Sequence, residues 1–265
     1  FDYSWSPDGK WFTLEFIGNR HDPYSDIGMV SAQGGKIINL TNSGYTSGSP
    51  RWVLDGNAIL FITERYGMRA HASWGSLNDV MLVFMNQDAY DKFRLSKEDY
   101  ELQKELEKEQ KNTTEAKKND KKKGDNKEKS EEKKEEKVKD IVVELNNIED
   151  RIVRLTPNSS DLGSAIITKD GETLYYLSAF EGGYDLWKMN LRKKDTKLLH
   201  KMDAGWANME MDKDGKNLFL LGSNTMQKMG TDSESLKPIS YQAHVKMDLA
   251  AERDYMFNHV YKQEQ

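Results

Sequence analysis

The chain has 265 residues, of which 37% are hydrophobic and 31% charged, with a formal net charge of -5 and no cysteine. This length suits one or two domains, and the lack of cysteine excludes disulfides and Cys-ligated zinc. The acidic balance argues against nucleic-acid binding, and no apolar run reaches the ~18 residues that a membrane span needs. Because the chain opens on Phe1 within a strand-like pattern, we interpret it as an excerpt of a longer protein.

The first predicted element is a hairpin turn within the stretch SWSPDGKWFTLEF, residues 4–16. In Pro7-Asp8-Gly9 the first residue presets its own φ, the second tolerates bridge or left-handed backbone, and the third accepts positive φ. The residues that follow alternate, and one face of the alternation holds Phe12, Leu14 and Phe16. A period of two predicts a strand after the turn.

The Asp-Gly pair recurs three times, at Asp55-Gly56, Asp170-Gly171 and Asp214-Gly215. An apolar residue lies three positions before the Asp of every copy, and two more lie four and six positions after it. In addition, a Leu lies fifteen positions before each of the last three Asp residues, twice as part of a Leu-Thr pair: Leu40-Thr41 and Leu155-Thr156. Agreement at several offsets over four copies indicates an internal repeat.

Each copy holds short strand-like segments within about 45 residues, which is the size of a β-propeller blade. The third segments are expected at residues 27–30, 80–85, 186–189 and 245–249. No long helical pattern separates the strands, so a parallel βαβ fold is disfavoured. We therefore predict an all-β fold, a partial β-propeller of about four four-stranded blades, with the blades at residues 1–44, 45–160, 161–204 and 205–249.

The second blade is interrupted by a long insertion at residues 86–140. Residues 86–106 have helical spacing, and Ser96 followed by Asp99 resembles a capping box. Residues 107–137 contain no Leu, Ile, Val, Met or aromatic side chain, which predicts a disordered or weakly helical tract. We interpret the insertion as a solvated excursion at the blade edge; the alternative is an arm that binds a partner or membrane headgroups.

The chain ends in a predicted helix at residues 250–265 that enters a following domain. Its apolar residues fall on one helical face: Met256, Phe257, Val260 and Tyr261. We expect the last blade to lack its outer strand, because no fourth segment follows residue 249. Four blades are few for a closed ring, so we expect an open arc or part of a larger ring.

The sequence offers no catalytic, metal or cofactor site. Gly-x-Ser-x-Gly, His-Glu-x-x-His and Gly-rich phosphate loops are all absent. Only the loop at residues 64–79 combines hydrogen-bond donors with aromatic side chains, which suits a peptide carboxylate or a docking surface. The candidate binding residues are Arg65, Tyr66, Arg69, His71 and Trp74. The alternative is that this loop packs against a neighbouring domain.

Several stretches together resemble the tricorn-type serine peptidases of family S41. WSPDGKWFTLEF followed by DIGMVSAQGGKIINLT is similar to the PD40 blade repeat, which is unspecific by itself. The loop RYGMRAHASWGS, the insertion stretch AYDKFRLSKEDYE and the trailing helix RDYMFNHVYKQE extend the likeness. The repeat is degenerate after its first copy, since the second copy has Val53-Leu54 where Ser-Pro would stand.

This resemblance implies a non-catalytic propeller that gates or channels peptides and supports assembly. In the family, a helical region, a PDZ domain and the peptidase core follow the propellers, so the catalytic residues would lie beyond Gln265. The implied partners are peptides or unfolded protein segments, those downstream domains and other copies of the chain. The resemblance implies a cytoplasmic location, while the periplasm is the alternative.

Two other interpretations stay open. A propeller-bearing relative of the prolyl oligopeptidases would require a Gly-x-Ser-x-Gly motif further along the chain. A TolB-like propeller would bind proteins without an attached enzyme, although the amphipathic helix after the last blade argues against it.

Overall fold

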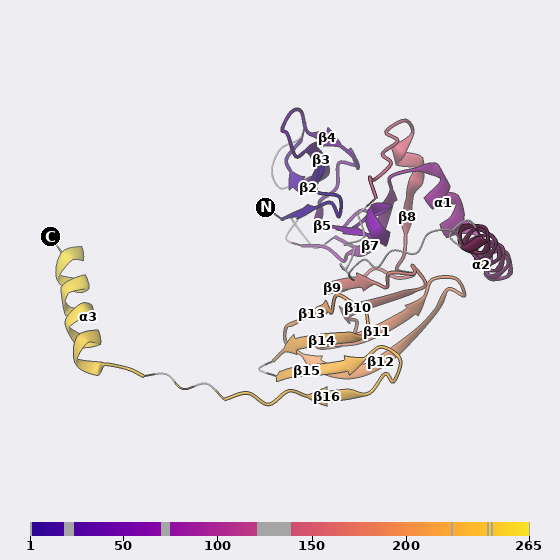
Figure 1. The fold of residues 1–265 in the computed structure, drawn as a ribbon. Coiled ribbons are helices and arrows are strands. Elements are labelled where there is room, and N and C mark those ends of the chain that lie inside the picture. Colours follow the sequence, from indigo (N-terminus) through magenta and orange to yellow (C-terminus); the bar gives the residue numbers. More distant parts are fainter. Residues whose placement is uncertain are drawn as a thin grey trace, which may run out of the picture.

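The computed structural model describes residues 2–18, 24–69, 75–120, 139–223, 225–242, 244 and 246–264. It contains four antiparallel sheets of four strands each, arranged as the blades of a propeller (Figure 1). Within each sheet the strands pair in chain order, so every blade is a simple meander. The predicted all-β fold with four four-stranded blades is therefore confirmed.

Blades one and two lie at the amino-terminal end of the arc. Blade one contains β1 (Tyr3–Trp5), β2 (Trp11–Phe16), β3 (Asp26–Ser31) and β4 (Ile38–Asn39). Blade two contains β5 (Ser47–Val53), β6 (Ala58–Thr63), β7 (Asp79–Phe84) and β8 (Ile152–Arg154), with the short 3-10 helix η1 (Leu54–Gly56) between its first two strands.

Blades three and four complete the arc. Blade three contains β9 (Asp161–Ile167), β10 (Thr173–Ala179), β11 (Tyr184–Asn190) and β12 (Asp195–Ala204). Blade four contains β13 (Ala207–Met211), β14 (Asn217–Gly222), β15 (Thr225–Gly230) and β16 (Leu236–Pro238).

The spacing of the repeat follows from how neighbouring blades pack. The residues four and six positions after each Asp point toward the preceding blade, as Ile59 and Phe61 pack on blade one. The side chains five and seven positions after the Asp point toward the following blade, as Tyr175 and Leu177 pack on blade four. Alternation along a strand sends successive side chains to opposite faces, so each blade contributes to two apolar layers.

In blades one and three, the Asp-Gly turn is stabilised by the serine or threonine two residues before the Asp, and Asp212 has this position in blade four. The Ser6 hydroxyl donates to the Asp8 carboxylate at 2.6 Å and accepts from the Trp11 amide at 2.9 Å. Thr168 has the same place beside Asp170 in blade three. Blade two has Val53 there, and its turn instead places Leu54 and Asp55 at positive φ.

A buried carboxylate closes each of the first two blades. Asp26, at the start of β3, accepts from the Thr41 hydroxyl at 2.8 Å, and Asp79 of β7 accepts from Thr156 at the same distance. Each threonine hydroxyl oxygen in turn accepts a hydrogen bond from a backbone amide of the third strand. The Leu-Thr pair of the repeat is therefore the closure of a blade, in which the leucine packs in the core and the threonine bonds the third strand.

The insertion joins β7 to β8 and begins with two helices. These are α1 (Gln87–Arg94) and α2 (Lys97–Asp120), and the predicted cap is confirmed, because the Asp99 amide donates to the Ser96 hydroxyl. Helix α2 continues into the Lys/Glu-rich tract, whose residues favour helix; residues 121–138 lie outside the described chain. The chain returns through the 3-10 helix η3 (Ile148–Arg151), where buried Arg151 donates to the carbonyls of Phe84, Asn146 and Glu144.

Two expectations for blade four are wrong. Its third strand is β15 (Thr225–Gly230) and not residues 245–249, and its outer strand is present as β16. Only two residues separate β14 from β15, and the first of them, Ser223, has a positive φ, whereas longer connections precede the third strands of blades one and two. The pattern Thr-Met-Gln-Lys-Met is too polar to be recognised as a strand, although Met229 is fully buried.

The predicted terminal helix is present as α3 (Leu249–Gln263), with Asp248 as its N-cap. It stands apart from the blades (Figure 1), and none of its residues is buried. Within the described residues, no helix is both long and apolar enough to cross a membrane.

We expect Thr156→Val to lower the free energy of unfolding by about 1–3 kcal/mol, because it leaves the buried Val80 amide without its acceptor and removes one of the hydrogen-bond donors to Asp79. Thr196→Val is the matched control, because the Thr196 hydroxyl is buried without a partner in the described structure; its change should stay within about 0.5 kcal/mol. Urea unfolding of both variants measures the difference, and equal effects would contradict the role of the closure.

Blades three and four are also joined by charge. Glu234, in the turn after β15, accepts from Lys188 at 2.5 Å and from Lys197 at 2.7 Å, both in blade three. The hydrogen bonds from Lys188 and Lys197 hold the pKa of Glu234 below its usual value of 4.5. A carboxyl group with a lowered pKa stabilises the fold above its unfolded pKa, and this contribution is lost as the pH falls through the folded pKa.

Glu234→Gln should therefore destabilise the protein at pH 7, and the difference from wild type should shrink as the pH falls below about 4.5. Urea unfolding at a series of pH values measures this. Glu181→Gln, at an exposed position without an ion pair in the described structure, is the control and should show no such trend. A difference for Glu234→Gln that is constant down to pH 2 would contradict the ion-pair explanation.

Candidate functional site

The antiparallel meander gives the propeller two distinct faces. The turn face carries the turns between first and second strands and the connections between third and fourth strands, including α1 and α2. The loop face carries the loops between second and third strands and the connections from blade to blade. Hydrogen bonds between backbone segments follow this division, as from Asn78 to Ser160 on the loop face.

The predicted binding loop lies on the loop face, between β6 and β7. Arg69 and Ser76 form a β-bridge across it, and the Leu77 amide donates to the Met68 carbonyl at 3.1 Å. A Cβ at Gly67 would lie 1.7 Å from the Leu77 carbonyl oxygen, so this close approach requires glycine. The loop is thus an ordered hairpin at the residues described, with Tyr66 48% exposed at its base.

Three of the five predicted binding residues are brought into one aromatic and cationic surface. Tyr66 has the guanidinium of Arg65 at 5.5 Å and that of Arg154 at 5.0 Å from its ring centre. Arg69 reaches toward blade one, where its guanidinium lies 5.8 Å from the ring centre of Tyr24 and 4.9 Å from that of Tyr45, in the connection between blades one and two. His71 and Trp74 lie outside the described residues.

The three arginines of this surface differ in whether they form an ion pair. Arg154 is bound to the buried Asp79 carboxylate at 2.8 Å. Within the described part of the chain, neither Arg65 nor Arg69 forms an ion pair, and both instead lie against tyrosine rings. Guanidinium groups held on aromatic rings retain donors for a carboxylate or a peptide carbonyl.

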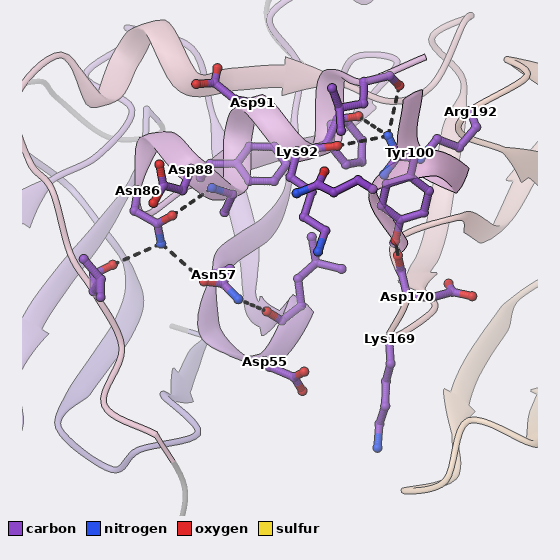
Figure 2. Close-up of a pocket in the computed structure, with 18 of the residues that line it drawn as sticks. Asp55, Asn57, Asn86, Asp88, Asp91, Lys92, Tyr100, Lys169, Asp170 and Arg192 are labelled. Carbon is purple, nitrogen blue, oxygen red and sulfur yellow. Dashed lines mark hydrogen bonds between the residues drawn. The ribbon is translucent and has the colours of Figure 1, made fainter. Parts of the chain in front are cut away.

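Sequence reasoning missed a cavity of about 840 Å³ on the turn face. Its walls are the blade-two turn, α1, the start of α2 and the blade-three turn, as Figure 2 shows. Asn86 fixes the entry to α1, because its carboxamide accepts from the Ala89 amide and donates to Asn57. The apolar lining is Leu54, Phe84, Phe93, Leu95, Tyr100 and Val142.

Arg192 of blade three holds the helices against this cavity. Its Nη1 donates to the carbonyls of Lys92, Phe93 and Leu95 at 3.2, 2.7 and 3.1 Å. The guanidinium also lies 3.7 Å from the ring centre of Tyr100 (Figure 2). The open carbonyls at the end of α1 are thereby satisfied, and this contact joins segments about a hundred residues apart in the sequence.

A smaller cavity of about 410 Å³ lies where the inner strands β5, β9 and β13 approach one another. Its lining includes Arg51, Ser164 and the half-exposed Trp206. No cluster of three or more potential metal ligands is found among the described residues. The Asp26 carboxylate is bound in the closure of blade one.

We expect Arg192→Ala to loosen the helices of the insertion, because three charge-assisted hydrogen bonds and the Tyr100 contact are lost. Amide hydrogen exchange should accelerate by about tenfold or more over residues 87–106. Lys193→Ala, which removes an exposed cation one residue away, should leave this exchange unchanged. Unchanged exchange in Arg192→Ala would show that the helices are held by other contacts.

No family model matches the chain, so the resemblance to family S41 and to PD40 repeats stays a prediction. A stretch of 59 residues is 39% identical to the uncharacterized peptidase YuxL of Bacillus subtilis, and it covers 22% of this chain and 9% of that protein. The chain therefore spans only a small part of this relative.

Solved structures with similar folds include peptidases and a binding protein. The tricorn protease superposes over 90% of this chain and 22% of its own, with a TM-score of 0.57 and 10% identity. TolB from Acinetobacter baumannii matches over 92% of this chain and 44% of its own, with a TM-score of 0.51 and 15% identity. A puromycin-hydrolyzing peptidase of Mycobacterium tuberculosis matches over 92% and 30%, with a TM-score of 0.51 and 10% identity. At these identities the likeness establishes a fold shared by peptidases and by TolB proteins.

Proposed function

We propose that this chain is the non-catalytic propeller region of a larger tricorn-like serine peptidase and presents peptides to catalytic domains elsewhere in that protein. The observation that carries the proposal is the fold shared with the tricorn protease over 90% of the chain. The short stretch of sequence identity to a peptidase supports it from a different direction. The resemblance of the sequence to family S41 is the basis for proposing a tricorn-like serine peptidase in particular.

In this proposal the loop face receives the peptide. Arg65 and Arg69 offer guanidinium donors held on the rings of Tyr66 and Tyr45. The turn face is instead covered over blade two by α1 and α2. A peptide in extended form would meet exposed aromatic and cationic groups on the first face, which suits its carbonyls and its terminal carboxylate.

Downstream PDZ and peptidase domains are the proposed partners within the same protein, and assembly with further copies follows from the same resemblance. The exposed helix α3 would lead into the next domain, since its large apolar side chains have no buried position here.

A protein-binding role of the TolB kind is the second candidate. It is favoured by the share of each solved chain that superposes on this one, which is 44% for TolB and 22% for the tricorn protease. The two candidates differ in chemistry, because only the first requires peptide hydrolysis by the complete protein.

The test compares this chain with the protein made from its complete reading frame. We expect the complete protein to cleave an unstructured fluorogenic peptide, and the 265-residue chain to bind the peptide without cleaving it. Hydrolysis by the 265-residue chain would contradict its non-catalytic role. Binding of a folded protein, with no hydrolysis by the complete protein, would favour the TolB-like candidate.

The binding surface is tested by charge reversal. The double variant Arg65→Glu/Arg69→Glu should weaken peptide binding by about tenfold or more, as measured by fluorescence anisotropy. Lys216→Glu makes the same kind of change on the exposed turn of blade four, on the turn face, and should leave binding unchanged. Equal affinities for wild type and the double variant would exclude the loop face as the peptide site.

A further inference from the structure

The outer face of blade one is an apolar surface on which no other blade packs within the described residues. Tyr3, Trp5 and Phe12 form an aromatic cluster, with ring centres 3.5 Å apart for Trp5 and Phe12 and 6.5 Å apart for Tyr3 and Phe12. Leu14 extends the same face, because it pairs with Tyr3 across the two strands. Tyr3 and Trp5 are 70% and 53% exposed.

The same positions of the repeat are covered in the later blades. Tyr3 lies five residues before the Asp of its turn. The residues at this position are Ala165 in blade three and Met209 in blade four, which are 5% and 1% exposed. Three residues before it, Trp5 corresponds to Ile167, which is 6% exposed. The outer face of blade one is therefore the face that every later blade buries against its predecessor.

The interface between blades one and two shows what covers such a face. Ile59 and Phe61 of blade two pack against Ile27, Met29 and Leu40 of blade one. These partners are aliphatic side chains of a third strand and of the residue that follows a fourth strand. The chemistry that fits Trp5, Phe12 and Leu14 is therefore the corresponding aliphatic face of another four-stranded sheet.

The opposite end of the arc has a mixed surface. On the outer face of blade four, Phe219 and Leu221 are partly exposed, but the Lys228 ammonium lies 5.8 Å from the ring centre of Phe219. Glu210 of the same blade pairs with Arg51 at 3.4 Å. Charged groups next to the apolar residues make this end less costly to leave in water than the aromatic cluster of blade one.

We propose that the outer face of blade one is the docking surface for a further four-stranded blade of the same protein, which presents an aliphatic third strand. Continuity with the three blade–blade interfaces carries the proposal, because each of them buries this face on a neighbouring blade. The similar solved chains are longer than this one and superpose on about nine-tenths of it, which leaves room for added blades. The proposal does not depend on the peptidase assignment.

Cysteine labelling tests this directly, because the chain contains no cysteine. Tyr3→Cys is made both in the 265-residue chain and in the protein from the complete reading frame, and maleimide modification of the Tyr3→Cys peptide is followed by mass spectrometry. We expect at least about tenfold slower labelling in the complete protein. Leu198→Cys, on the outermost strand of blade three, is the control, because an added blade cannot cover it; its rate should be the same in both proteins.

A photo-crosslinker on the Tyr3→Cys thiol then identifies the occupant. Capture of a peptide from the same polypeptide with the Asp-Gly repeat spacing supports the proposal. Equal labelling of Tyr3→Cys in both proteins overturns it, since the face would then be open to water. If labelling of Tyr3→Cys in the 265-residue chain slows as the protein concentration rises, a second copy is the occupant and the proposal is overturned. Capture of a segment that lacks the Asp-Gly repeat spacing overturns it as well.

Discussion

The hydrogen-bonded carboxylate that begins the third strand is the interaction on which the first two blades depend. Asp26 and Asp79 are fully buried, and a buried charge is tolerated only where hydrogen bonds replace its hydration. Their partners, Thr41 and Thr156, lie just after the outermost strand, so each carboxylate fixes the end of one blade to its own interior. The chain leaves this point in a defined direction, and the next blade begins within a few residues.

This closure explains how blade two tolerates its insertion. Two helices and a long charged tract separate β7 from β8, yet closing a longer loop costs only logarithmically more entropy. The blade with the longest connection has the closure with a full ion pair, since Arg154 binds Asp79 and Ser159 donates to its second oxygen. Arg151 adds a second anchor at the root of the insertion through three backbone carbonyls. The fold at this point depends on contacts at the ends of the insertion, and its length matters little.

Much of the architecture could be predicted from the sequence because the blade repeat is local. The positions of the apolar residues relative to each Asp-Gly pair predict which side chains face the preceding blade, because side chains alternate with a period of two along a strand. The third strand of blade four was missed because Met226 and Met229 are set among polar residues and the preceding turn is very short. The cavity on the turn face was missed for another reason: Arg192 joins α1 across about a hundred residues, and no local pattern encodes such a contact. The loop at residues 64–79 was predicted from composition, but Tyr24 and Tyr45, which support Arg69, come from two other segments of the chain.

The two faces of the propeller therefore follow from different physical requirements. On the turn face, short Asp-Gly turns leave room for the insertion, which packs helices over blade two and is bound there by Arg192. On the loop face, the closures at Asp26 and Asp79 need rigid strand ends, and the longer second-to-third strand loops extend beyond them. Aromatic rings from one of these loops and from the connection between blades one and two then hold Arg65 and Arg69, and neither arginine forms an ion pair within the described structure. Because threonine and Arg154 already satisfy the buried carboxylates, the ion pairs of the described residues do not use Arg65 or Arg69, and the proposed peptide site is therefore placed on the loop face.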